Sequence, residues 1–249
     1  MLSLPALAHA VCAHFARLDA DLAAQQAVRG LDALDERDLH RLLAAAAETV
    51  GYGVLLEVPY PGASRSGRPP RRPRRSERER CDLVLTPLPG QRLADPVEAL
   101  MERDKAEATL FAHLAEEPVA AAPGAPPPVA PEDTLWLEVK TLGQYCFREG
   151  VPGPNPSYAG ELVGGPARDI AKLARDPQII TAAAMVVLFC ESEQVARHDL
   201  AEAANRWLDR DLPIADPIID GLPIQDRIGN AWCAVAMVRV RGGMMNDER

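Results

Sequence analysis

The chain has 249 residues, of which 47% are hydrophobic, so it can build the core of one large domain or two small ones. Its formal net charge of -9 argues against a protein that coats nucleic acid with its whole surface, although a local basic patch remains compatible with it. The five cysteines form no Cys-x-x-Cys pair and the five histidines have no zinc-ligand spacing, which predicts reduced thiols in a cytoplasmic protein.

The first eighty residues predict two helices, a strand and a basic loop. Apolar residues recur every three or four positions from Leu4 to Leu22, which predicts an amphipathic helix within an N-terminal segment, 1–30. A second, Ala-rich helix is expected over 34–50, with acidic residues in its first turn, and a strand over 54–60 ends at a Pro-Gly turn.

Residues 63–80 carry eight arginines and three prolines and cannot bury enough apolar surface to fold alone. We expect this Arg-rich loop to contact the phosphates of a nucleic acid, because positive charge is concentrated here in an otherwise acidic chain. The alternative is a solvated linker. The predicted nucleic-acid-binding residues are Arg65, Arg68, Arg71, Arg72, Arg74, Arg75, Arg78 and Arg80.

The middle of the chain predicts two strands separated by an insertion. A strand over 81–85 is followed by a helical stretch over 95–117 and a Pro/Ala-rich spacer, so that 95–133 form the insertion before the next strand, 135–142. The remainder predicts a Gly/Pro-rich loop over 146–165, followed by elements that alternate between helix and strand. These elements are a helix at 167–175, a strand at 183–190, a helix at 198–208, a strand at 231–240 and a tail at 242–249.

This order predicts an α/β or α+β domain over 31–241, with a mixed sheet covered by helices on both sides. The longest apolar run, 179–190, is much shorter than the roughly 20 residues that a membrane span needs, so no membrane partner is expected.

The chemistry of the chain is concentrated on two strands. Alternation along 135–141 places Glu138 and Lys140 on one face, and alternation along 81–85 points Asp82 away from the core face of Leu83 and Leu85. If these strands pair, Asp82 lies beside Glu138, and two carboxylates suit a hard cation such as Mg²⁺ or Mn²⁺.

Lysine is scarce in this chain. The 27 basic residues include only three lysines, at positions 105, 140 and 172, so a lysine inside an apolar strand is a specific choice over arginine. The alternative is a structural ion pair on an exposed sheet edge. If Asp82 is not the partner of Glu138, Asp95 or Asp133 would have to replace it.

The acidic helix, the following strand, Asp82 and the Glu138-Val139-Lys140 run resemble the PD-(D/E)XK, or restriction-endonuclease-like, nuclease superfamily. The resemblance covers the order of elements from about 34 to 240. It implies that Asp82, Glu138 and Val139 form the metal site and that Lys140 assists the attacking water. Cys81 replaces the proline of the motif, and the 55 residues between Asp82 and Glu138 require an insertion between the second and third core strands.

Three further residues are candidates for the site. The resemblance implies a glutamate from the first core helix, for which Glu36 competes with Glu48 and His40. Glu57 either faces the site or marks an open sheet face, because an unpaired carboxylate in an apolar strand is costly. Gln144 follows Lys140 as a glutamine does in some superfamily members, although a polar turn residue would look the same.

The resulting hypothesis is a Mg²⁺-dependent deoxyribonuclease, an endonuclease of restriction, repair or defence type. Its expected partner is nucleic acid, most simply DNA, and the protein could act as a homodimer or with a partner protein. The alternative is a catalytically inactive nuclease-fold subunit that binds nucleic acid or serves as a scaffold. A third reading is an assembly protein whose spacer and Arg-rich loop contact other proteins.

Overall fold

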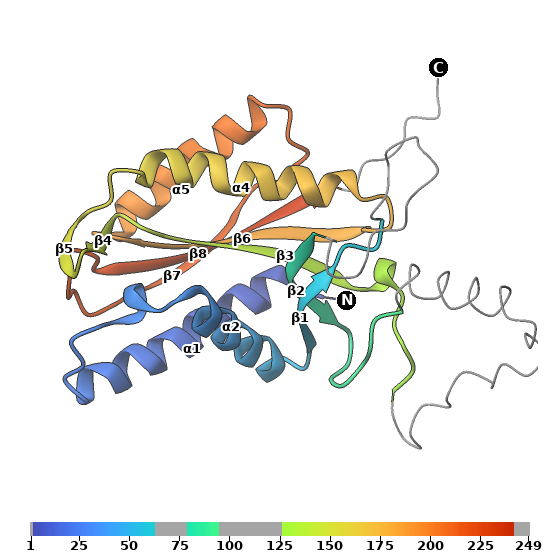
Figure 1. Cartoon of the computed structure of the whole chain (residues 1–249), viewed down its shortest axis with the longest axis horizontal. Coiled ribbons are helices and arrows are strands. Elements are labelled where there is room, and N and C mark those ends of the chain that lie inside the picture. Colours follow the sequence, from blue (N-terminus) through green and yellow to red (C-terminus); the bar gives the residue numbers. More distant parts are fainter. Residues whose placement is uncertain (1, 63–78, 95–125, 242–249) are drawn as a thin grey trace, which may run out of the picture.

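A computed structural model of the chain describes residues 2–62, 79–94 and 126–241. These residues form a mixed sheet of six strands in the order β1-β2-β3-β6-β8-β7, with helices on both faces (Figure 1). The strands of this sheet are β1 (Gly53–Pro59), β2 (Arg80–Thr86), β3 (Leu135–Gly143), β6 (Thr181–Cys190), β7 (Ile218–Pro223) and β8 (Trp232–Arg241). The helices are α1 (Leu4–Ala24), α2 (Glu36–Thr49), α4 (Tyr158–Arg175) and α5 (Glu193–Leu208), and short 3-10 turns lie at Leu31–Ala33 and Pro131–Asp133.

The strand directions follow from the connections. Strands β1, β2 and β3 form an antiparallel meander, whereas β6 runs parallel to β3 because α4 carries the chain back across the sheet. Strand β8 then pairs antiparallel with both β6 and β7, and β7 forms the far edge. The expected mixed sheet with helices on both sides is confirmed.

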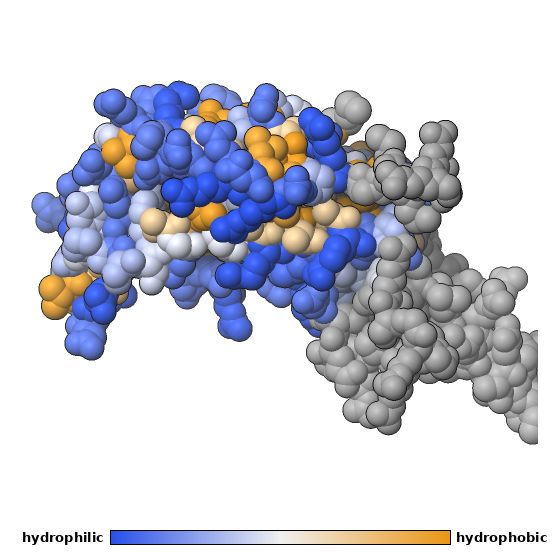
Figure 2. Space-filling view, turned by 90° about the horizontal axis from the view of Figure 1, so that it is seen from above, coloured by the Kyte–Doolittle hydropathy of each residue, from blue (hydrophilic) through white to orange (hydrophobic). Residues whose placement is uncertain are grey.

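Two apolar cores lie on the two faces of the sheet. Helices α1 and α2 cover one face and α4 and α5 cover the other (Figure 1). Alternate residues of each strand divide between these cores; in β3, for example, Leu137 joins the α1/α2 core and Trp136 joins the α4/α5 core. Figure 2, which looks onto α4 and α5, shows a largely hydrophilic outer surface with scattered apolar residues. No helix within the described ranges has the length and apolar character to cross a membrane.

The N-terminal helix belongs to the main core. Helix α1 begins at Ser3, whose hydroxyl accepts a hydrogen bond from the Ala6 amide, and it buries Leu7, Val11 and Phe15 in the α1/α2 core. Helix α2 begins at Asp35, whose carboxylate caps the Asp38 amide at 2.8 Å, with acidic residues in its first turn.

The sequence-based prediction was wrong in three places after β3. The expected loop over 146–165 contains a hairpin of β4 (Tyr145–Arg148) and β5 (Val151–Pro154) and the first two turns of α4. Gly and Pro residues suppress the helix signal there, but packing of the apolar face of α4 on the sheet overrides propensity. Strand β7 was missed because it is a short edge strand containing Gly and Pro, and α5 begins earlier than expected because Ser192 caps it.

Candidate functional site

The predicted site lies where β2 and β3 part. The antiparallel ladder between them ends at Leu83 opposite Leu137, one step before Asp82 would face Glu138. In place of the next ladder bond, Oδ2 of Asp82 accepts a hydrogen bond of 2.7 Å from the backbone amide of Val139. Asp82 therefore holds β3 in place at the residue between Glu138 and Lys140.

Strand β1 is irregular opposite the same point. Glu57 has a φ of 54°, in the left-handed region that a residue with a Cβ seldom adopts, and the β1–β2 ladder passes from Leu56 to Val58 without pairing Glu57. The guanidinium of Arg80 donates a hydrogen bond of 2.9 Å to the carbonyl of Glu57. The side chain replaces a ladder bond, so the distorted backbone keeps a partner for its carbonyl.

This irregularity corrects the predicted orientation of Asp82. Strict alternation would place Asp82 on the face opposite Leu83, toward α4. Leu83 packs in the α1/α2 core as expected, but Cys81 packs in the α4/α5 core, so alternation is interrupted between them. The carboxylate of Asp82 lies close to side chains of α2, the helix that covers the face of Leu83.

Asp82 forms a three-residue cluster with Glu36 and His40. One carboxylate oxygen of Glu36, a ring nitrogen of His40 and one carboxylate oxygen of Asp82 all lie within 4.8 Å of one another. Glu36 and His40 are four residues apart on α2 and therefore share a helix face. Of the candidates on this helix, Glu36 and His40 both reach Asp82, and exposed Glu48 is not part of the cluster.

His40 supplies a second, independent indication of a ligand. Its side chain is only 6% exposed, and its Nε2 atom makes no hydrogen bond to any residue that the structure describes. A buried polar atom without a partner is costly, which favours a ligand at this position. Two carboxylate oxygens and one imidazole nitrogen fit a divalent cation, and the nitrogen suits Mn²⁺ better than Mg²⁺.

Glu138 faces the other side of the sheet and is 3% exposed. Its carboxylate accepts a hydrogen bond from the hydroxyl of Tyr60 and lies 3.7 Å from Nζ of Lys172 on α4. Burial and then the nearby negative charge of Asp82 raise the pKa of Glu138 to about 8, although Tyr60 and Lys172 favour the ionised form. Asp82 and Glu138 thus interact electrostatically but have different hydrogen-bond partners.

Lys140 points to the same side as Glu138 and pairs with α4. Its Nζ lies 3.4 Å from Oδ2 of buried Asp169. This oxygen makes no hydrogen bond to any residue in the described ranges, so the contact with Lys140 is electrostatic. Lys172 lies 3.1 Å from the other oxygen of Asp169. Glu138, Lys140, Asp169 and Lys172 therefore form a continuous network of two acids and two ammonium groups.

Two members of this network, Asp169 and Lys172, were not predicted as site residues, and neither was Tyr60, whose hydroxyl donates to Glu138. Tyr60 is 5% exposed and stacks on Trp136 with ring centroids 5.8 Å apart, which holds its hydroxyl against Glu138. Burial raises the pKa of Tyr60 above its usual range, so it remains a donor. The scarcity of lysine could have indicated Lys172, because two of the three lysines meet in this network. Nothing in the sequence indicates Tyr60 or Asp169.

Two other predicted residues, Gln144 and Asp133, are not part of the cluster around Asp82 or of the network around Glu138. Gln144 supports a turn, where its Oε1 accepts a hydrogen bond of 3.1 Å from the Glu191 amide. Asp133 is exposed at the end of a 3-10 turn, and Asp95 lies outside the described residues, as do all the predicted arginines of the loop except Arg80.

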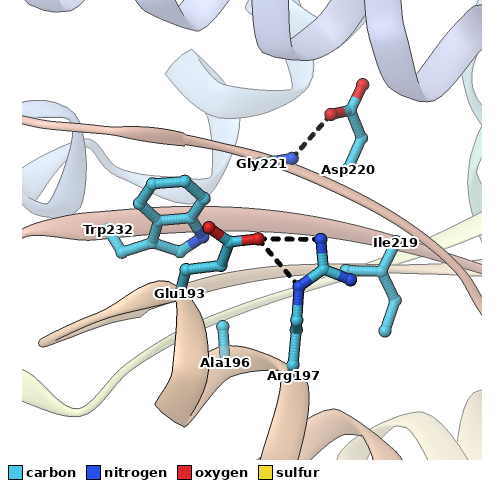
Figure 3. Close-up of a pocket in the computed structure, with 7 residues that line it drawn as sticks. All are labelled: Glu193, Ala196, Arg197, Ile219, Asp220, Gly221 and Trp232. Atoms are coloured by element: carbon cyan, nitrogen blue, oxygen red, sulfur yellow. Dashed lines mark hydrogen bonds and ion pairs between the residues drawn. The ribbon is translucent and has the colours of Figure 1, made fainter.

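Two surface pockets are formed by different elements of the fold. A pocket of about 220 Å³ lies at the far edge of the sheet, between α5, β7 and β8 (Figure 3). There the Arg197 guanidinium pairs with Glu193 at 2.8 Å, and Asp220 accepts a hydrogen bond from the Gly221 amide. The other pocket, of about 620 Å³, lies between α2, β1 and β2 and is lined in part by three arginines and by His40 of the cluster.

Comparison of the chain with protein-family models, with curated proteins and with solved structures gives no match.

Proposed function

We propose that the chain is a metal-dependent nuclease of restriction-endonuclease-like type. The observation that carries the proposal is the cluster of Glu36, His40 and Asp82, in which the imidazole of His40 lies beside two carboxylates and its buried Nε2 atom has no described partner. The order of α2, β1, β2 and β3 in a mixed sheet covered on both faces is compatible with the restriction-endonuclease-like core.

In this proposal Glu36, His40 and Asp82 hold the cation. When bound there, Mn²⁺ or Mg²⁺ would polarise a phosphodiester and lower the pKa of a bound water. Asp82 is the best-positioned ligand, because its Oδ2 accepts a hydrogen bond from the Val139 amide and the orientation of its carboxylate is therefore restrained. Buried Leu39 and Leu43 anchor α2 on the sheet and hold Glu36 and His40 toward Asp82.

Glu138 and Lys140 have the second set of roles. Glu138 lies close enough to Asp82 for the two carboxyl groups to interact, and burial and the charge of Asp82 together favour its protonated form by raising its pKa. Lys140 is partly exposed on the α4 side of the sheet, with its stem against Gly165 and its ammonium group beside Asp169. We assign it to orienting the attacking water, which would have to pass between the two sides of the sheet where the β2–β3 ladder ends. Asp169 is the positioning partner of this ammonium group.

Cation binding tests the proposal without relying on turnover. We expect isothermal titration with Mn²⁺ to show one site in the wild type, and the Asp82→Asn variant to bind at least about 10-fold more weakly. Asparagine can still accept the Val139 hydrogen bond, so the loss would report charge. His40→Gln should weaken Mn²⁺ more than Mg²⁺, and Glu48→Gln, an exposed carboxylate on the same helix, should bind like the wild type. Equal affinity of Asp82→Asn and the wild type would contradict the proposal.

Cleavage is then measured on plasmid and single-stranded DNA with Mn²⁺, Mg²⁺ or chelator. We expect cleavage in the wild type with metal, none with chelator, and loss of cleavage in Lys140→Ala with cation affinity retained. Cleavage that survives both Asp82→Asn and Lys140→Ala would remove the assignment of these residues.

The catalytically inactive binding subunit remains the second candidate, and one observation favours it. Glu138 is engaged by Tyr60 and Lys172 in a buried network, as expected of a structural acid. This candidate predicts salt-sensitive nucleic-acid binding that ignores divalent cations and survives Glu138→Ala.

A further inference from the structure

The pocket between α2, β1 and β2, here called the arginine pocket, has no assigned role. It has a volume of about 620 Å³, within the range of small-molecule sites in proteins. Its lining residues are Arg37, His40, Arg41, Leu56, Glu57 and Arg80. Three guanidinium groups and one carboxylate give it a positive charge in a chain whose net charge is -9.

The three arginines are accessible. Arg37 and Arg41 are exposed and one turn apart on α2, where Arg41 lies 3.3 Å from Asp38 in an exposed pair that contributes little. Arg80 uses one nitrogen on the Glu57 carbonyl and is itself exposed. Since a guanidinium has five donors, each arginine retains donors for an anion such as phosphate.

The same pocket offers an apolar contact and a hydrogen-bond acceptor. Leu56 is 44% exposed, and Glu57, whose backbone is left-handed, is also exposed. An apolar side chain beside a carboxylate suits a nucleobase that carries an exocyclic amino group, because the base packs on the leucine and donates to the carboxylate. A paired base in a duplex presents its faces to its neighbours and cannot use such a contact.

The arginine pocket adjoins the proposed cation site, because His40 belongs to both. We propose that this pocket seats one unpaired nucleotide of a single-stranded or locally opened nucleic acid, with its phosphate on Arg37, Arg41 and Arg80 and its base on Leu56 and Glu57. The phosphodiester next to this nucleotide is then presented to Glu36, His40 and Asp82. Only this last step depends on the proposed nuclease function; binding in the pocket does not.

The experiment measures binding in chelator, so it remains informative if the protein is not a nuclease. Fluorescence anisotropy would follow a labelled 20-residue single strand and the blunt duplex of the same sequence with the full-length protein. We expect the single strand to bind more tightly, and Arg37→Ala and Arg80→Ala each to weaken it by about 5- to 10-fold and to lower the salt dependence by about one phosphate contact. Arg206→Ala, an exposed arginine on α5 across the sheet, is the matched control and should bind like the wild type.

The base contact is tested with homopolymers. Oligo-dC carries an amino group that oligo-dT lacks, so the wild type should prefer dC, and Glu57→Ala, which removes the acceptor, should reduce this preference. Pocket variants that bind as tightly as the wild type, or a duplex that binds as tightly as the single strand, would overturn the proposal. If the pocket variants weaken nucleic-acid binding but the protein binds no divalent cation, the proposed nucleotide site would be supported and the proposed nuclease function would be contradicted.

Discussion

At the scale of residues, Asp82 and Glu138 are distinguished by their surroundings. Asp82 is fastened to a backbone amide and adjoins an imidazole and a second carboxylate on α2, whereas Glu138 is buried beside a tyrosine and a lysine. The sequence suggested that these two carboxylates share one site, but they lie on the two sides of the sheet. The negative charge of Asp82 is still close enough to raise the pKa of Glu138.

This raised pKa predicts how stability depends on pH. The folded-state pKa of Glu138, about 8, lies above the value of 4.5 for the unfolded chain, so the folded state keeps a proton that the unfolded state loses. Glu138 therefore lowers the free energy of unfolding progressively as pH rises between these two values. We expect Glu138→Gln to remove this pH-dependent loss. Between pH 5 and pH 8.5, the free energy of unfolding of this variant should rise by about 2 kcal/mol or more relative to that of the wild type.

Urea denaturation in chelator at both pH values measures this difference. Glu48→Gln, at an exposed position of α2, serves as the control and should track the wild type at both pH values. A Glu138→Gln variant that loses stability relative to the wild type as pH rises would contradict the predicted direction.

At the scale of elements, the interruption of β1 and β2 shapes both the candidate site and the arginine pocket. Glu57 lies opposite Asp82, and three irregular features occur together at this residue. Its backbone is left-handed, it is unpaired in the β1–β2 ladder, and its carbonyl accepts the hydrogen bond from Arg80. A regular pair of strands would continue the alternation of Leu83 through Asp82 and direct Asp82 toward α4. The distortion is thus associated with the approach of Asp82 to α2 and with the outward placement of Glu57.

The left-handed conformation of Glu57 predicts a reversed order of glycine and alanine at this position. Glycine adopts a positive φ at no steric cost, whereas a Cβ is strained there, so Glu57→Gly should be more stable than Glu57→Ala by about 1 kcal/mol. Urea denaturation of the two variants measures the difference. At Thr141, an exposed position of β3 without positive φ, alanine should be the more stable of the same two substitutions. Alanine more stable than glycine at both positions would contradict the prediction.

At the scale of the whole molecule, one sheet separates two apolar cores and joins them into a single unit. Helix α1 packs against α2 and also against strands β7 and β8. The N-terminal helix therefore contacts the last strands of the chain. The arginine pocket and the pocket between α5, β7 and β8 lie toward opposite edges of the sheet. The positive charge of the arginine pocket is local in an otherwise acidic molecule. This charge would direct a nucleic-acid strand to one place on the surface.

This arrangement predicts cooperative unfolding. Phe15 of α1 is fully buried, and Phe15→Ala should lower the free energy of unfolding by about 3–5 kcal/mol. Trp136 and Trp207 report from the other core, so tryptophan fluorescence and circular dichroism should give the same, earlier midpoint in urea. Val28→Ala, at a side chain that is 85% exposed, is the control and should change stability by less than about 0.5 kcal/mol. If α1 unfolded while the tryptophan fluorescence stayed unchanged, the two cores would not unfold as a single cooperative unit, and the prediction would be wrong.

The sequence by itself determined the regular elements that repeat a simple pattern. The heptad-like apolar spacing of α1, the acidic start of α2 and the apolar runs of β2, β3, β6 and β8 predicted their elements, because burial of one face imposes a period on the sequence. It also placed Glu138 and Lys140 on one face of β3, and their shared contacts with α4 agree. Elements with Gly and Pro, such as β7 and the first turns of α4, lack that period and were missed.

Only the tertiary structure decided which charged groups meet. His40 looked like one polar residue on a solvated helix face, and its burial beside Asp82 depends on how α2 lies on the sheet and on an interruption of strand alternation at Glu57. Tyr60 and Asp169 reach Glu138 and Lys140 from separate elements. Periodicity records which side of its own element a residue occupies, whereas a site is formed by side chains of several elements, whose distances arise only when those elements pack.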